Sequence, residues 1–383
     1  MECVWYSTTP SITTMSRLFK KSTLQLIINP INNSKMKKKF LLLLLTASAF
    51  TYSAKAQDTV KTTADAPLVL YGSVDTYYKD DLSGHANIPT SFASDNNSIS
   101  IGMIDLGLKK TVGNASFVGE MSFGPRNDQS IPTAGYHIQN LYVSYNLTPK
   151  LSATAGYMST FIGYEVISPT GNFNYSTSYL FTNGPFQNAG FKLTYAFSDK
   201  VSLMAGIFND QWNAYTSQHD VSTFGAQLTI TPVKNWTAYL NVATGPTSGT
   251  ELDLTTAYQI TTAFKLGLNA ATFSPSHYGG GFSGVALYPQ LAVSKVVTLG
   301  LREEYFKAKT VDAGSTYVLA GPLPGGSVIG STLTANIKAG PLTFIPEVRL
   351  DNVNKKQYST FTDSSLAPTA SASQFVLAAV YAF

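Results

Sequence analysis

The sequence predicts an all-β fold, a transmembrane antiparallel β-barrel of about sixteen strands with short periplasmic turns and long extracellular loops. The chain ends on a segment, residues 373–383, in which large apolar side chains occupy alternate positions, as in a strand with one apolar face. Only 13% of the residues are charged, whereas an ordinary globular domain has about a quarter. No apolar run reaches the roughly eighteen residues that a membrane-spanning helix needs. Low charge without helical spans is typical of a membrane barrel, in which only alternate residues meet lipid.

The terminal strand places Phe375, Leu377, Tyr381 and Phe383 on one face, and the sequence stops at Phe383. This ending is typical of outer-membrane proteins, because the last strand of a barrel closes on the first and leaves no open edge in lipid. A buried C-terminal strand of a soluble β-sandwich is the alternative that this segment alone leaves open. Phe383 also resembles the signal read by the outer-membrane barrel-assembly machinery, which we expect as a partner during biogenesis.

The N-terminal part of the chain carries an export signal. Three lysines, Lys37–Lys39, precede an apolar run over residues 40–50, and Ala54-Lys55-Ala56 supplies a small-x-small cleavage site. This order is that of a secretory signal peptide, whose apolar core is too short to span a bilayer. A mature protein whose mass required residues upstream of Met36 would contradict this interpretation. The predicted divisions are a spurious upstream extension at 1–35, a signal peptide at 36–56, a short periplasmic segment at 57–67 and the barrel at 68–383.

The formal charge of +4 arises from the leading segment. Residues 1–56 hold eight Lys or Arg and one acid, which leaves 18 basic and 21 acidic residues from Gln57 onward. No basic face for nucleic acid is evident, so no nucleic-acid partner is predicted. The only cysteine, Cys3, precedes the signal peptide, so neither a disulfide scaffold nor a thiolate site is predicted in the remainder.

Strand-like runs begin at Leu68 and recur to the end of the chain. Short turns, such as 112–114 and 339–341, alternate with long polar or Gly/Pro-rich loops, such as 162–185 and 353–372. Short turns at one end and long loops at the other are what an outer-membrane barrel shows. The predicted strands are 68–79, 98–110, 115–124, 136–147, 151–161, 186–197, 201–212, 221–231, 235–244, 251–260, 264–273, 283–294, 297–309, 327–338, 342–352 and 373–383.

The predicted strands have one apolar face and one mixed polar face. In 342–352, apolar residues alternate with Glu347, Arg349 and Asp351. A charge that faces lipid at mid-membrane costs roughly 2–4 kcal/mol, so we expect the charged face to line the lumen. Glu303 is an exception because it shares the parity of an apolar row, and we expect it near the outer rim or behind a β-bulge.

The loop after the fifth predicted strand has a recognisable sequence. Residues 161–195, FIGYEVISPTGNFNYSTSYLFTNGPFQNAGFKLTY, together with the preceding strand motifs Asn140–Val143 and Ala155–Tyr157, resemble the central part of the β-barrel porin-2 (OmpL-like) family. These are Gram-negative outer-membrane proteins that are frequent in Bacteroidota. The resemblance extends over 67–383, and it implies a barrel embedded in outer-membrane lipid with porin activity. Its motifs are structural rather than catalytic.

A sixteen-stranded barrel is wide enough for an aqueous channel unless a loop folds into it. By analogy with general porins, we expect loop 162–185 to fold inward, with Glu165 and the Asn/Tyr-rich run 172–179 at the constriction. Separated patches of opposite sign would favour hydrated polar solutes over apolar ones. The facing charges of lumen parity are Asp105, Lys109, Glu120, Arg302, Glu304, Glu347, Arg349 and Asp351.

Two alternatives stay open for these groups. Arg302, Glu304, Glu347 and Arg349 could instead form an ion-pair network that only stiffens the wall. For the aromatic and amide groups of the loop, packing of the loop on itself is a simpler explanation than stacking on sugars.

These features predict a porin that admits small hydrophilic solutes by passive diffusion, and a homotrimer is expected from other sixteen-stranded porins. The alternative is a non-conducting barrel that acts as a surface receptor, adhesin or structural protein. An enzyme is not predicted: His85, His219 and His277 lie in predicted loops whose sequence suggests no catalytic triad, and His137 has lipid-facing parity. No metal-ligand spacing and no phosphate-binding loop occur, so no catalytic, metal or cofactor residue is assigned and no cofactor is expected.

Overall fold

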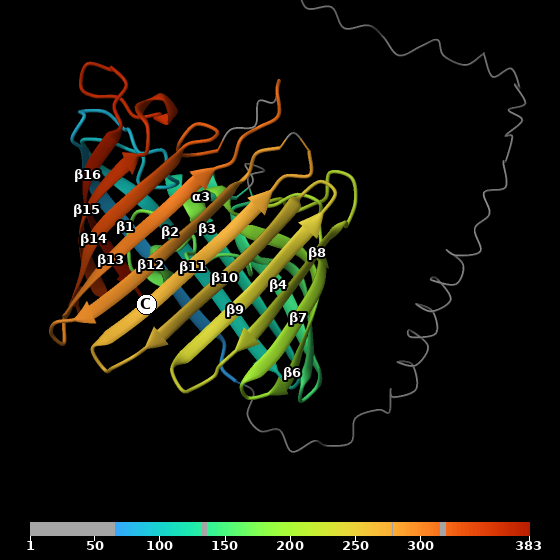
Figure 1. Cartoon of the computed structure of the whole chain (residues 1–383). Coiled ribbons are helices and arrows are strands. Elements are labelled where there is room, and N and C mark those ends of the chain that lie inside the picture. The colour runs from blue at the N-terminus through green and yellow to red at the C-terminus, as the bar shows by residue number, and fades with distance from the viewer. Residues whose placement is uncertain (1–65, 132–135, 278, 315–318) are drawn as a thin grey trace, which may run out of the picture. The chain divides into compact units, whose positions relative to one another are not determined.

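Sixteen antiparallel strands close into one barrel, in which consecutive strands pair and β16 returns to pair with β1 (Figure 1). The computed structural model describes residues 66–131, 136–277, 279–314 and 319–383. The predicted extension at 1–35, the signal peptide at 36–56 and residues 57–65 lie outside the described residues. The closed antiparallel order confirms the predicted fold class. The strands are β1 (Val69–Asp81), β2 (Ser98–Val112), β3 (Ala115–Phe123), β4 (Ile138–Thr148), β5 (Leu151–Ser159), β6 (Gln187–Ser198), β7 (Val201–Phe208), β8 (Thr223–Ile230), β9 (Trp236–Gly245), β10 (Gly249–Gln259), β11 (Phe264–Ser274), β12 (Phe282–Ala292), β13 (Val297–Ala308), β14 (Ser327–Ala339), β15 (Leu342–Val353) and β16 (Ser371–Ala382).

Short turns gather at one end of the barrel and longer loops at the other (Figure 1). At the turn end, Gly113 has a φ of 55° between β2 and β3, a left-handed conformation that glycine adopts without steric strain. At the loop end, residues 354–370 connect β15 to β16. The helices of the described residues are short and lie in the loops: α2 (Pro125–Ser130), α3 (Tyr179–Asn183) and the 3-10 turns η2 (Pro169–Gly171) and η3 (Lys356–Tyr358). None of these helices has both the length and the apolar character needed to cross a membrane.

The predicted strand 201–212 extends beyond the observed end of β7. The run 201–212 ends as a strand at Phe208. Asp210 then accepts hydrogen bonds from the backbone N–H groups of Gln218 and His219, each at 2.8 Å, and so fixes a loop. The alternation of apolar residues continues past the point where side-chain hydrogen bonds divert the backbone.

The two faces of the strands are arranged as the alternation predicts. In β15, Glu347, Arg349 and Asp351 are 1%, 1% and 0% exposed, whereas Val348 between them is 54% exposed. The exposed row therefore meets the membrane, and the charged row points into the barrel, where loops and other side chains cover it. The same outward row of large apolar side chains recurs on the other strands, with Leu141 and Leu333 as examples.

Glu303 lies in the outward-facing row of β13, between Leu301 and Tyr305. The expected bulge is absent from β13, because its pairing with β14 keeps one register through Glu303↔Ser331. Glu303 is half-buried by its neighbours on this face rather than turned into the lumen. A carboxylate on the lipid-facing side costs less than an arginine or lysine would on the same side at the same depth.

The barrel closes where the last residue meets the first strand. Phe383 exchanges two backbone hydrogen bonds with Gly72, from the N–H of Gly72 at 3.1 Å and from its own N–H at 3.0 Å. The ring of Phe383 covers Gly72 so closely that a Cβ atom there would lie 2.9 Å from the ring and would also collide with the backbone oxygen of Asp105. Gly72 therefore leaves the room in which the C-terminal ring packs.

Replacing Gly72 with Ala should weaken the closure of the barrel by about 1–3 kcal/mol, because the new methyl group overpacks the β1–β2 pairing and the Phe383 ring. Denaturant unfolding of the refolded protein, followed by the heat-dependent gel shift of folded barrels, measures this loss. Gly119→Ala is the matched control, because a Cβ there meets only Leu141 at 3.9 Å. Equal stability of the two variants would contradict the packing role of Gly72.

Candidate pore constriction

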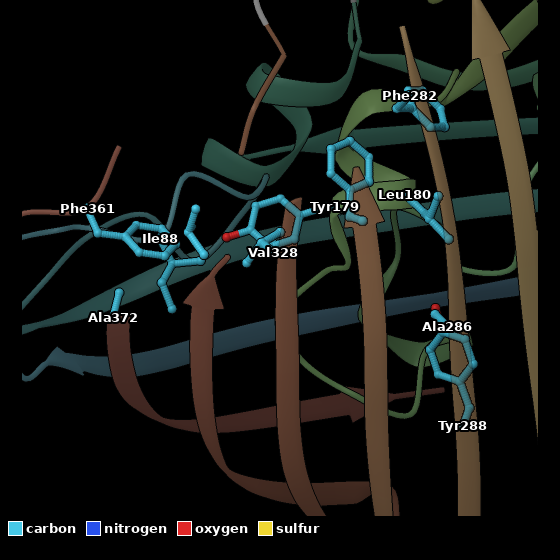
Figure 2. Packing of buried hydrophobic residues seen from close by; sticks show 11 residues of the cluster. Ile88, Tyr179, Leu180, Phe282, Ala286, Tyr288, Val328, Phe361 and Ala372 are labelled. Carbon is cyan, nitrogen blue, oxygen red and sulfur yellow. The ribbon is translucent and has the colours of Figure 1, made fainter. Parts of the chain in front are cut away.

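The loop between β5 and β6 folds into the barrel. Tyr175 and Tyr179 are 1% and 0% exposed, although both lie in a connection between strands. Tyr179 and Leu180 belong to the same buried cluster as Phe282 and Val328 of the wall (Figure 2). Residues 160–186 between the two strands are called the inner loop below.

A side-chain cap stabilises the first turn of α3, the short helix of the inner loop. The hydroxyl of Ser178 accepts a hydrogen bond from the backbone N–H of Phe181 at 3.0 Å, which caps α3. Ser178 also donates its hydroxyl hydrogen to Glu165 at 2.8 Å, and its own N–H donates to the same carboxylate at 2.7 Å. Glu165 thus ties the beginning of the inner loop to the start of α3.

Two glutamates of the wall hold the backbone of the inner loop. Glu347 accepts hydrogen bonds from the N–H groups of Tyr175 and Ser176, at 2.9 and 3.2 Å. Glu304 accepts from the N–H groups of 179–180, at 2.9 and 2.8 Å. Each buried carboxylate therefore binds two successive backbone donors that the loop would otherwise leave unsatisfied.

Arg302 holds the inner loop from the same wall. Its guanidinium forms an ion pair with Glu165 at 2.9 Å and donates to the backbone oxygen of Ser176 at 2.6 Å. Its second terminal nitrogen donates to the hydroxyl of Ser176 at 3.1 Å. Both members of the ion pair are almost fully buried, so each charge depends on the other and on these hydrogen bonds.

Arg349 and Asp351 form the second ion pair of the wall. Their side chains meet in a bidentate arrangement at 2.8 and 2.9 Å. Arg349 also donates to the backbone oxygen of Thr177 at 2.8 Å, and Asp351 accepts the hydroxyl of Tyr179 at 2.6 Å. The guanidinium lies 5.1 Å from the centre of the Tyr179 ring. This pair therefore binds both the backbone and an aromatic side chain of the inner loop.

Two further anchors come from residues that the sequence did not single out. Asp75 on β1 accepts the hydroxyl of Tyr175 at 2.5 Å. Arg126 in α2 donates to the backbone oxygens of Ile167 and Tyr175, at 3.0 and 3.2 Å, and its guanidinium lies 4.8 Å from the Tyr175 ring centre. Asp75 has lumen parity, which was a usable signal. Arg126 lies in a loop, where no periodicity indicates direction.

The aromatic hydroxyl groups of the inner loop add no charge. Tyr164 stacks on Tyr288 of β12 with 4.3 Å between ring centres. Burial, together with the negative charge of Glu165, raises the pKa of Tyr164 to about 12. Tyr164 is therefore a neutral phenol at physiological pH, and the charges beside the loop come from carboxylates, arginines and lysines.

The structure divides the predicted pore residues into two groups. Glu165, Arg302, Glu304, Glu347, Arg349 and Asp351 come together around the inner loop. Asp105 and Lys109 on β2 and Glu120 on β3 lie elsewhere on the wall, on strands that are not neighbours of β13–β15. Within the described residues, no group of three or more His, Cys, Asp or Glu is arranged to hold a metal ion.

Open space remains beside the inner loop, on the side of β1–β6. A cavity of about 370 Å³ is lined by Asp105 and Glu120 of the wall and by 165–168 of the inner loop. A second cavity of about 600 Å³ is lined by Lys109, Lys192 and, again, Glu120. Because the two cavities share Glu120 and further wall residues, they adjoin along the lumen.

Comparison with known proteins gives a family and a fold. The family described as "Putative beta-barrel porin-2, OmpL-like" matches residues 67–383. Solved structures with a similar fold include OmpT of Vibrio cholerae in a trimer form (TM-score 0.52, 12% identity, 83% of this chain and 99% of that one). An anion-selective porin from Comamonas acidovorans (TM-score 0.55, 12% identity, 84% and 100%) and OprB of Pseudomonas putida (0.50, 10%, 82% and 93%) are also similar. No curated protein matches the sequence.

Replacing Arg302 with Gln should destabilise the protein strongly, because Glu165 then stays buried without its cation. Loss of one partner of a buried ion pair costs about 3–5 kcal/mol. We expect Glu165→Gln to be destabilising too, and R302Q/E165Q to lose less than the sum of the single losses. Unfolding in denaturant measures all three.

The matched control is Lys307→Gln, at the exposed loop end of the same strand, which should change stability by no more than about 0.5 kcal/mol. Strictly additive losses in R302Q/E165Q would show that the two side chains do not depend on each other.

Proposed function

We propose that this chain, which belongs to the β-barrel porin-2, OmpL-like family, lets small hydrophilic solutes diffuse passively through a water-filled lumen that loop 162–185 narrows. The family and the closed sixteen-stranded barrel support an outer-membrane porin-type protein and point to a transport channel rather than an enzyme. The narrowing by the loop and the class of solute are the new parts of the proposal.

The observation that carries the proposal is that the inner loop lies inside the barrel and that most of its charged anchors come from one part of the wall. Its backbone is bound by Glu304 and Glu347, and its Glu165 by Arg302, all from β13–β15. The cavities lie toward β1–β6. A loop inside the barrel reduces the cross-section of the lumen, and the cavities beside it leave an off-centre passage, which suits diffusion of small solutes more than complete closure.

Assembly with other copies forms part of the proposal. The solved OmpT structure with a similar fold is a trimer form. A homotrimer of this chain would hold three such barrels in the outer-membrane lipid, each with its own lumen. The size of the refolded protein in detergent distinguishes this assembly from a monomer.

Single-channel recording tests the proposed pore. Residues 57–383, refolded into a planar bilayer, should give conductance steps of steady size. Removal of residues 165–180, bridged by a short Gly/Ser linker, should raise the conductance about twofold or more, because the inner loop no longer occupies the lumen. This increase in conductance is expected only if the inner loop forms the narrowest part of the lumen.

The matched control removes residues 364–366, which are exposed in the β15–β16 loop and do not enter the barrel. Its conductance should equal that of the unchanged protein. A folded barrel that never conducts would contradict the porin proposal and favour a receptor, adhesin or structural role. An unchanged conductance after removal of 165–180 would contradict the constriction alone.

A further inference from the structure

We propose that the narrowed lumen prefers cations, and above all small solutes whose positive group carries hydrogen-bond donors, over anions. This inference rests on the proposed porin function and adds the charge class of solute that the same passage admits. It follows from the different surroundings of basic and acidic side chains beside the inner loop.

The arginines near the inner loop are occupied by contacts within the protein. Arg302 is paired with Glu165, and Arg349 with Asp351. Arg126 binds two carbonyl oxygens of the loop and faces two aromatic rings. All three are at most 2% exposed, and none lines the 370 Å³ cavity. These arginines therefore hold the loop, and their burial and their partners within the protein weaken their effect on a passing ion.

Of the three acids that line the cavity, Glu165 is paired with Arg302, whereas Asp105 and Glu120 have only neutral partners among the described residues. Asp105 accepts the hydroxyl of Ser73 at 2.7 Å. Glu120 accepts the hydroxyl of Tyr71 at 3.1 Å and the side-chain amide of Asn140 at 2.9 Å. Neither acid takes part in an ion pair with any described residue. Their hydrogen bonds fix the position of the carboxylates without cancelling their charge.

Gln139 adds a further oxygen acceptor beside the two carboxylates, and this oxygen has no donor among the described residues. Gln139 lines the same cavity and is 4% exposed, and its side-chain oxygen has no hydrogen-bond partner in the described part of the chain. A buried acceptor without a partner costs free energy unless something donates to it. Asp105 and Glu120 therefore present carboxylate oxygens to a visiting ammonium or guanidinium group, with the unpartnered oxygen of Gln139 buried beside them, whereas the described lining of this cavity contains no Lys, Arg or His for an anion.

Two lysines lie in the wider neighbouring cavity. Lys109 and Lys192 line the space of about 600 Å³, where Lys109 is exposed. In the larger cavity their field on a passing ion is expected to be more strongly screened than the field of the carboxylates in the smaller cavity. The lysines thus oppose the preference of the acids without reversing it, and removing Lys192 should increase that preference.

Reversal potentials in a tenfold KCl gradient across a planar bilayer test the inference on refolded residues 57–383. We expect K⁺ to permeate about fivefold better than Cl⁻, as two uncompensated carboxylates near the passage would give in largely aqueous surroundings. Asp105→Asn combined with Glu120→Gln should bring the ratio close to one. Lys192→Gln should raise it.

Glu303→Gln is the matched control, because it removes one carboxylate of the same barrel from the outward-facing row and should leave the reversal potential unchanged. Steady channels with a ratio near one, or with preference for Cl⁻, would overturn the inference and leave the porin proposal intact. A ratio that is unchanged in the Asp105/Glu120 variant would also overturn it. A barrel that never conducts would overturn the porin proposal together with this inference.

Discussion

The buried contacts between the inner loop and strands β13–β15 are the interaction on which the rest of the site depends. Arg302, Glu304, Glu347 and Arg349 are each at most 1% exposed. Burial of charges is expensive unless each is paired and hydrogen-bonded, and the inner loop supplies those partners through its backbone and through Glu165. The buried charges of β13–β15 therefore depend on the inner loop for their partners, and the position of the inner loop depends on those charges. This mutual dependence fixes one position for a segment that has little regular structure of its own.

The same contacts determine where the open space lies and what charge it carries. The arginines bind the inner loop and do not line the open space on the side of β1–β6. Acids line the cavity next to the inner loop, and lysines line the cavity that adjoins it. In the proposed pore, a single array of side chains would thus set both the width of the passage and its electrostatic character.

The fold could be predicted from the sequence because alternation with period two states which face of each strand meets lipid. Parity alone places Glu347, Arg349 and Asp351 inside the barrel, and their burial confirms it. Parity does not say which groups meet. Glu165 and Arg302 are 137 positions apart and come together only when the inner loop folds back. Arg126 could not be found from parity because loops have no period. Of the two positions expected for Glu303, the one behind a bulge is wrong, because the strand keeps a regular register there.

Cross-linking of the inner loop to the wall tests the central claim most directly. The only cysteine, Cys3, precedes Gln57, so N174C/T334C would give residues 57–383 just two thiols. These side chains are joined by a hydrogen bond of 2.7 Å between the inner loop and β14. A short bifunctional thiol reagent should link them in the folded barrel in near-complete yield and leave the single-channel conductance unchanged, because the loop already occupies that position. Absence of the link, or a conductance that changes when it forms, would contradict a loop fixed against β13–β15.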